Sequence, residues 1–217
     1  MVFSKSITFD DEEIGQAVVS AHKDITRSNE EALFIDKLRA GDAVAFETLV
    51  DRYSGDLYSL LFRLTENPEE ACDLTQDTFL RALRSIGNFR GDSELKTWLF
   101  RIAINESRNR FRWWKRRRRD LTVSLDVTIG DSDTVLSDTL TDRSASPEET
   151  ALSREREYAI KAALIDVPDV YREAIALCDI EGLSYEETAT ALGVGIGTVK
   201  SRISRGREEL RRRLKDF

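Results

Sequence analysis

The stretch GLSYEETATALGVGIGTVKSR, residues 182–202, decides how the C-terminal third of the chain folds. Ser184 is followed three residues later by Glu187, a spacing that predicts a capping box at the start of a helix. Ala189 stands four residues before Gly193, and Val199 stands six residues after it. A small residue at the crossing, a glycine in the turn and an apolar anchor predict a helix-turn-helix.

We expect the second helix to begin near Thr198, with Val199, Ile203 and Leu210 facing inward. The N-terminal half of such a helix enters the major groove of DNA, where Arg, Lys and Ser bond to base edges and phosphates. The alternative is a solvated basic face, which the turn spacing and the capping box make the weaker explanation. The candidate duplex-binding residues are Thr198, Lys200, Ser201, Arg202, Ser204, Arg205 and Arg207.

Upstream, the pattern is also helical, and no alternating strand pattern occurs. Apolar residues recur at steps of three and four as far as Asn67-Pro68, which predicts a helix that ends there. Because proline suits the first turn of a helix, a new helix is expected over residues 68–85. Gly87 and Gly91 mark a loop, and another helix is expected from Ser93 or Glu94. We therefore predict an all-α protein of two small helical domains, residues 30–118 and 148–217, with an N-terminal extension over 1–29.

A net charge of −7 would by itself argue against binding of nucleic acid, but the charges are unevenly distributed along the chain. Residues 101–119 hold nine basic residues and one acid, and residues 200–215 hold eight basic residues and two acids. Phosphate binding depends on such local charge. Residues 120–150 hold eight acids and one base, so we expect residues 119–147 to be a flexible acidic linker.

One basic stripe lies on the helix expected after Glu94. Arg101, Asn105, Arg108, Arg112, Lys115 and Arg119 recur at steps of three and four, on one face. Phe89 and Trp98 flank a polar loop that could hold an unstacked base, although both could equally be core aromatics. The candidate DNA-binding residues of this helix and loop are Phe89, Arg90, Asp92, Ser93, Trp98, Asn105, Arg108 and Arg112.

A separate acidic face is expected on the helix over residues 68–85. Asp73, Gln76 and Asp77 stand at i, i+3 and i+4, and are therefore surface neighbours. Leu74, Phe79 and Leu83 supply apolar contacts around them. A solvated acidic face is the usual explanation of such a trio.

Four stretches together resemble an extracytoplasmic-function (ECF) sigma factor, the compact class with only the second and fourth sigma regions. They are residues 73–79 (DLTQDTF), 89–93 (FRGDS), 97–105 (TWLFRIAIN) and 182–202. The resemblance implies a region 2-like bundle that docks on the clamp helices of the largest polymerase subunit through Asp73, Gln76, Asp77 and Phe79. It also implies reading and melting of the −10 element by the 89–93 loop and the Asn105 helix, and reading of the −35 element by the 200–207 face.

The resemblance further implies core RNA polymerase, including its flap region, and promoter DNA as partners, with an anti-sigma factor as a regulator. No cofactor, metal or catalytic residue is expected, because the one histidine, His22, lies in the polar extension and no carboxylate cluster has metal-ligand spacing. Cys72 and Cys178 are expected to be buried free thiols. We expect a cytoplasmic protein without membrane insertion. The alternative function is a stand-alone helix-turn-helix regulator, which would leave the N-terminal domain unexplained.

Overall fold

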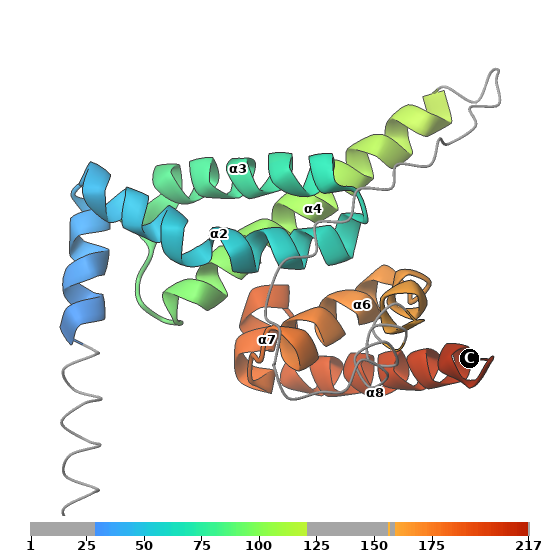
Figure 1. Ribbon diagram of the computed structural model, residues 1–217. Helices are drawn as coiled ribbons and strands as arrows, with labels where there is room; N and C mark the ends of the chain where they lie inside the picture. The colour runs from blue at the N-terminus through green and yellow to red at the C-terminus, as the bar shows by residue number, and fades with distance from the viewer. Residues whose placement is uncertain (1–28, 121–155, 157–158, 217) are drawn as a thin grey trace, which may run out of the picture. The chain divides into compact units, whose positions relative to one another are not determined.

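The computed structural model describes residues 29–120, 156 and 159–216, and every regular element in these ranges is helical (Figure 1). The expected all-α class is confirmed for this part of the chain. The chain separates into two compact units. The first contains the described residues up to Arg52 together with Leu83–Phe89, and the second contains Tyr53–Ala82 and the described residues from Arg90 onward.

In the first unit, a helix over residues 29–39 is followed by Gly41, whose φ of 78° turns the chain. Helix α2 (Ala43–Thr65) then begins directly after Asp42. The Asp42 carboxylate accepts hydrogen bonds from the backbone N–H groups of Val44 (2.8 Å) and Ala45 (3.2 Å). The carboxylate thus satisfies backbone N–H groups that have no partner in the first turn of a helix, which explains why α2 begins there.

Helix α3 (Pro68–Ser85) has the bounds expected from the sequence. Asn67 caps it by accepting a hydrogen bond from the Glu70 N–H at 3.0 Å, and Pro68 occupies the first turn. The short helix η1 (Ile86–Asn88) follows. Helix α4 (Leu95–Asp120) begins one or two residues after the expected start and runs for 26 residues.

Charged side chains connect the helices of the second unit. Lys96 of α4 forms an ion pair with Asp56 of α2 at 2.8 Å, and Arg110 of α4 pairs with Asp77 of α3 at 3.0 Å. Leu99, on the inner side of α4, is completely buried. The inner face of α4 is thus fixed in the core, and its outer face is left for other contacts.

The C-terminal part contains a helix over residues 159–165, α6 (Asp169–Ile175), α7 (Tyr185–Leu192) and α8 (Ile196–Arg213), with η3 (Leu214–Asp216) at its end. Helix α6 changes after Ile175 into a π-helical turn, η2 (Ala176–Ile180). Single π turns inside helices are uncommon and often occur beside functional elements.

The capping box is confirmed. The Ser184 hydroxyl accepts a hydrogen bond from the Glu187 N–H (3.1 Å), and the Glu187 carboxylate accepts one from the Ser184 N–H (2.8 Å). Gly193 ends α7 with φ of 66°, a conformation that strains other residues. Helix α8 begins at Ile196, two residues before the expected start; Val199 and Ile203 are buried as expected, and Leu210 is partly buried.

Three further expectations concern cysteines, metals and membranes. Both cysteines are free thiols, but Cys72 is exposed, so its expected burial is wrong: α3 turns that position outward. Within the described ranges, no group of three or more metal-ligating side chains occurs. None of the described helices is long and apolar enough to cross a membrane. The expected extension and acidic linker lie almost entirely outside the described residues.

Candidate nucleic-acid interface

The outer face of α8 presents most of the residues expected to bind duplex DNA. Thr198, Lys200, Ser201, Ser204 and Arg205 are exposed, whereas Arg202 is partly buried. Lys200 Nζ lies 5.9 Å from the centre of the Tyr185 ring, so the first residue of α7 supports the cation from one side. The buried Val199 and Ile203 fix the rotation of the helix and hold this polar face outward.

Arg207 is exposed but already bonded to another side chain. Its guanidinium donates to both carboxylate oxygens of Asp179, at 2.9 and 2.5 Å. The hydrogen bonds and the charge of Asp179 raise the pKa of Arg207 above its ordinary value. A bidentate pair of this kind fixes geometry as well as charge. No local spacing could have revealed it, because the partners are 28 residues apart.

The expected stripe on α4 is partly exposed. Arg101, Asn105 and Arg112 lie at the surface, and Arg108 is partly buried. Arg112 donates to the Asn109 side-chain oxygen at 2.5 Å and to the Arg108 carbonyl at 3.3 Å. The side chains of Lys115 and Arg119 lie outside the described residues. Arg108 donates to both carboxylate oxygens of Glu173, at 2.8 and 2.6 Å. The exposed part of the stripe is therefore the Asn105 amide with the Arg101 and Arg112 cations.

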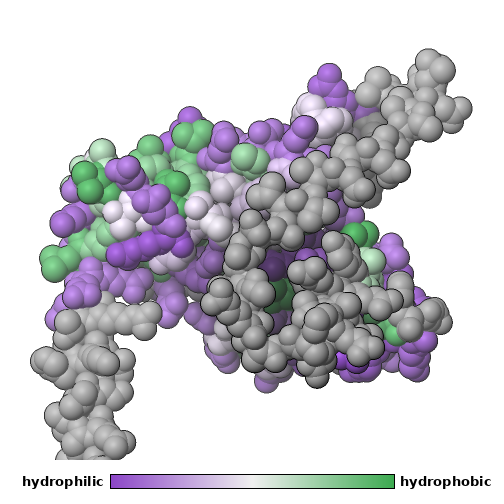
Figure 2. All heavy atoms as spheres, in the orientation of Figure 1, coloured by the Kyte–Doolittle hydropathy of each residue, from purple (hydrophilic) through white to green (hydrophobic). Residues whose placement is uncertain are grey.

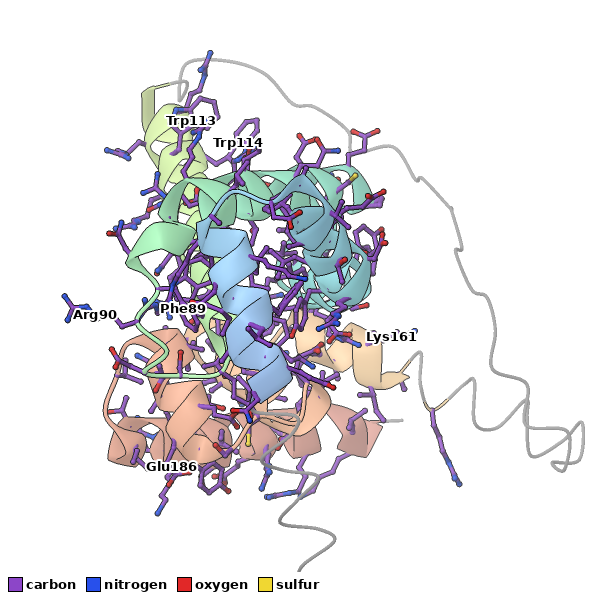
Figure 3. The ribbon with its side chains drawn as sticks, turned by 90° about the vertical axis from the view of Figure 1, so that its left-hand side faces the viewer. Phe89, Arg90, Trp113, Trp114, Lys161 and Glu186 are labelled. Carbon is purple, nitrogen blue, oxygen red and sulfur yellow. The ribbon has the colours of Figure 1, made fainter. Side chains whose placement is uncertain are left out.

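In the loop after η1, the polar residues are outside and the aromatic residues inside. Arg90 and Asp92 are exposed and Ser93 is partly buried, and Arg90 points away from the ribbon in Figure 3. Phe89 is 5% exposed and Trp98 is 6% exposed. The Phe89 carbonyl accepts a hydrogen bond from Arg39, which fixes the start of the loop. These low exposures favour the alternative, in which both aromatic side chains belong to the core.

On α3, Asp73 and Gln76 are exposed, as expected for a docking face. Asp77 is exposed too, but its carboxylate accepts a hydrogen bond from Arg110 at 3.0 Å. Phe79 is only 7% exposed, so its ring supports the helix from within. Leu80, which no sequence pattern indicated, is 50% exposed one turn after Gln76. The expected docking trio Asp73, Gln76 and Asp77 is thus accessible, with Leu80 exposed beside it.

Comparison with known proteins identifies the family. The Sigma-70 region 2 model matches residues 49–119, and the Sigma-70 region 4 model matches residues 158–210. The RNA polymerase sigma-H factor of Pseudomonas aeruginosa is 37% identical over 186 residues, which cover 86% of this chain and 94% of that protein. The chain belongs to the ECF sigma factors of RNA polymerase.

Two further relatives agree. The ECF sigma factor SigW of Bacillus subtilis is 36% identical over 84% of this chain and 96% of its own length. The sigma factor RpoE of Bartonella quintana, solved in complex with the anti-sigma factor NepR, superposes with a TM-score of 0.60 at 29% identity, covering 78% of this chain and 96% of that one. This ECF sigma factor is accordingly a transcription initiation factor and not an enzyme, and the stand-alone regulator is set aside.

Proposed function

We propose that this ECF sigma factor, bound to core RNA polymerase, reads the −35 promoter element as duplex with the exposed face of α8. The observation that carries the proposal is that face: Lys200, Ser201, Ser204 and Arg205 lie on the outside of a helix whose inner residues are buried. Arg and Lys bond to guanine edges or phosphates, and Ser bonds to either base type. Arg202 and Arg207 support the helix from its flanks.

We assign recognition and melting of the −10 element to α4 and the loop before it. Asn105 offers an amide to a base edge, and Arg112 offers a cation to phosphate. Capture of an unstacked base costs a few kcal/mol, roughly, which contacts with polymerase and phosphate must offset. In this proposal Phe89 and Trp98 act from beneath the loop, by holding Arg90, Asp92 and Ser93 at the surface.

We assign docking on polymerase to α3. Asp73, Gln76 and Asp77 form the polar part of the docking face, and Leu80 adds an exposed apolar side chain beside them. We assign this face to the clamp helices of the largest subunit, with Asp77 held in place by Arg110.

The domain bounds and the remaining partners belong to the same proposal. The region 2-like domain spans residues 30–118 and the region 4-like domain spans 148–217, joined by the acidic linker, residues 119–147; the flap region of core polymerase is a further proposed partner. An anti-sigma factor is the proposed regulator, since RpoE is held by one in its solved complex. Because core polymerase works in the cytoplasm, the protein is placed there.

The test is run-off transcription with purified core polymerase and a pool of promoter fragments. We expect initiation from a distinct subset of promoters only when the protein is present. Lys200→Ala/Arg205→Ala should abolish promoter selection while polymerase binding persists, and Asp73→Ala should weaken polymerase binding. Arg211→Ala, which removes an exposed arginine from the last turn of α8, and Glu69→Gln on α3 are the matched controls. Absence of both polymerase binding and initiation would refute the proposal.

A further inference from the structure

A groove of about 910 Å³ lies between α3 and α4, next to the stripe headed by Arg101, and Arg112 belongs to both. Its floor includes Leu74, which is 1% exposed. Asp77 lines it from α3, and Asn109, Trp113 and Arg116 line it from α4 at steps of four and three, which places them on one face of that helix. Asp77 also belongs to the proposed docking face, whereas Asn109, Trp113 and Arg116 take no part in the proposed promoter reading or polymerase docking.

The net charge of the groove is positive. Asp77 is paired with Arg110 at 3.0 Å, and Glu106 lies 3.9 Å from Arg81. Both carboxylates are therefore balanced by cations. Arg112 and Arg116 also line the groove, and each bonds only to neutral groups among the described residues. Two cations consequently remain to attract an anion.

Trp113 supplies an aromatic surface beside these cations. The side chain is 44% exposed. The Arg117 guanidinium lies 4.9 Å from the Trp113 ring centre, and Trp114 meets the ring edge-on at 5.1 Å. Figure 3 shows the two tryptophans together near the end of α4. These neighbours restrict the indole, so little conformational entropy is lost when a ligand stacks on it.

The arrangement of aromatic side chains around α4 favours nucleic acid over a membrane surface. Phe111, Trp113 and Trp114 are all exposed, and no acidic residue occurs over 107–119. A helix that lies on a membrane gathers its apolar side chains on one face. At about 100° per residue, Phe111 and Trp113 project roughly 200° apart, so they cannot share such a face. Aromatic side chains interleaved with cations are typical of surfaces that bind single-stranded nucleic acid.

We infer that this groove binds one unpaired nucleotide of single-stranded DNA, with the base stacked on Trp113 and the phosphate held by Arg112 and Arg116. The strand must be unpaired, because the face of a base is covered in a duplex. Arg112 belongs both to the groove and to the stripe that reads the −10 element. The inference therefore rests on the proposed function and extends it: the melted strand continues from the stripe into the groove.

The test uses holoenzyme, reconstituted with the full chain, and a fork-junction promoter fragment with a single-stranded segment. Trp113→Ala should weaken binding by about 5- to 100-fold, as expected for the loss of one stacked base, and Trp113→Phe should restore most of it. Phe111→Ala, which removes an exposed aromatic from the opposite side of the same helix, should change little. Arg116→Gln should lower the slope of log affinity against log salt by about 0.7, the value for one single-strand phosphate contact.

Abasic substitutions along the single strand identify the partner of Trp113. At one position, loss of the base should cost as much as Trp113→Ala, and the two losses should not add. Losses that add at every position would overturn the inference, and so would wild-type affinity in Trp113→Ala. Free mononucleotides that compete as well as the strand would also overturn it, in favour of a small-molecule site. Run-off transcription by wild-type holoenzyme tests the proposed function separately, so it can stand when the groove assignment fails.

Discussion

Arg207, in the fourth turn of the predicted DNA-reading helix, donates from Nε and Nη2 to the two carboxylate oxygens of Asp179, at 2.9 and 2.5 Å. Asp179 lies in the π-helical turn between α6 and α7. The pair thus joins α8 to the segment that precedes the helix-turn-helix. It makes Arg207 a residue that positions α8, whereas Lys200 and Arg205 remain available to DNA.

Asp179→Asn and Arg207→Gln should therefore weaken −35 duplex binding to a similar extent, about 2- to 5-fold, because an exposed ion pair contributes up to ~1 kcal/mol. The double variant should lose no more than either single variant. Neither change should alter the salt dependence of binding, whereas Arg205→Gln should lower the slope by about 0.9. Fluorescence anisotropy in a salt series measures all of these. A reduced slope in Arg207→Gln would show that Arg207 contacts phosphate.

Gly206 is buried where α8 crosses α6. A Cβ at this position would lie 2.5 Å from Ile175 Cδ1 and 3.1 Å from Tyr171 Cβ. Overpacking of this kind costs about 1–3 kcal/mol. Gly197, in the first turn of the same helix, has open space around it. We expect Gly206→Ala to be less stable to urea than Gly197→Ala, and Gly206→Val to be less stable still; equal stability of the alanine variants would contradict the close crossing.

The Ser184 cap should contribute measurably to stability. Ser184→Ala removes the acceptor of the Glu187 N–H and should lower the free energy of unfolding by about 0.5–2 kcal/mol. Thr190→Ala on the same helix removes only a hydroxyl bonded to the Glu186 carbonyl and is the control. Thermal unfolding followed by circular dichroism compares the two, and a smaller loss in Ser184→Ala than in the control would count against the cap.

Two neighbouring acids of α3 should respond differently to neutralisation. Asp77 is paired with Arg110, so Asp77→Asn should lower stability, by no more than ~1 kcal/mol because the pair is exposed. Asp73 is exposed on the docking face, so Asp73→Asn should weaken binding to core polymerase and leave stability unchanged. Urea unfolding and a polymerase binding titration separate these effects. Equal stability losses would mean that Asp73 has an intramolecular role.

The reactivity of the Cys178 thiol depends on the charge of the neighbouring Asp179. Burial raises the pKa of this thiol, and the negative charge of Asp179 raises it further, while Arg207 lowers it. Less thiolate is therefore present near neutral pH, and the thiolate is the reactive form. Asp179→Asn removes one raising charge, so alkylation of Cys178 at pH 8 should become faster. Mass spectrometry resolves Cys178 from the exposed Cys72, which serves as the internal reference.

Local sequence patterns predicted the helices well where the stabilising groups are close in the chain. Asn67-Pro68 and Ser184 with Glu187 act within three or four residues, and both helix starts were confirmed. The π-helical turn after Ile175 was not predicted, because nothing in its local sequence distinguishes it from a continuing helix. Gly206 shows the same limit: only the crossing of α6 explains why a side chain does not fit there.

Surface charge patterns were a less complete guide to the candidate sites. Where the coloured surface is visible, Figure 2 shows many hydrophilic residues together with a hydrophobic patch over the N-terminal helices. On such a surface, the sequence identifies which residues are charged but not which of them are already paired. Arg207 and Asp77 were selected for partners outside the chain, and both are bonded within it. Leu80 was not selected, although α3 exposes it.

By itself the sequence determined the helical class, the start of α3, the capping box of α7, the helix-turn-helix and the resemblance to ECF sigma factors. All of these depend on spacings of a few residues, which fix local hydrogen bonds and the face on which a side chain lies. Only the tertiary structure decided that Asp179 holds Arg207, that α6 excludes a side chain at Gly206, and that Trp113 borders a groove with Asp77. These relationships join residues that are distant in the chain, and packing alone brings them together.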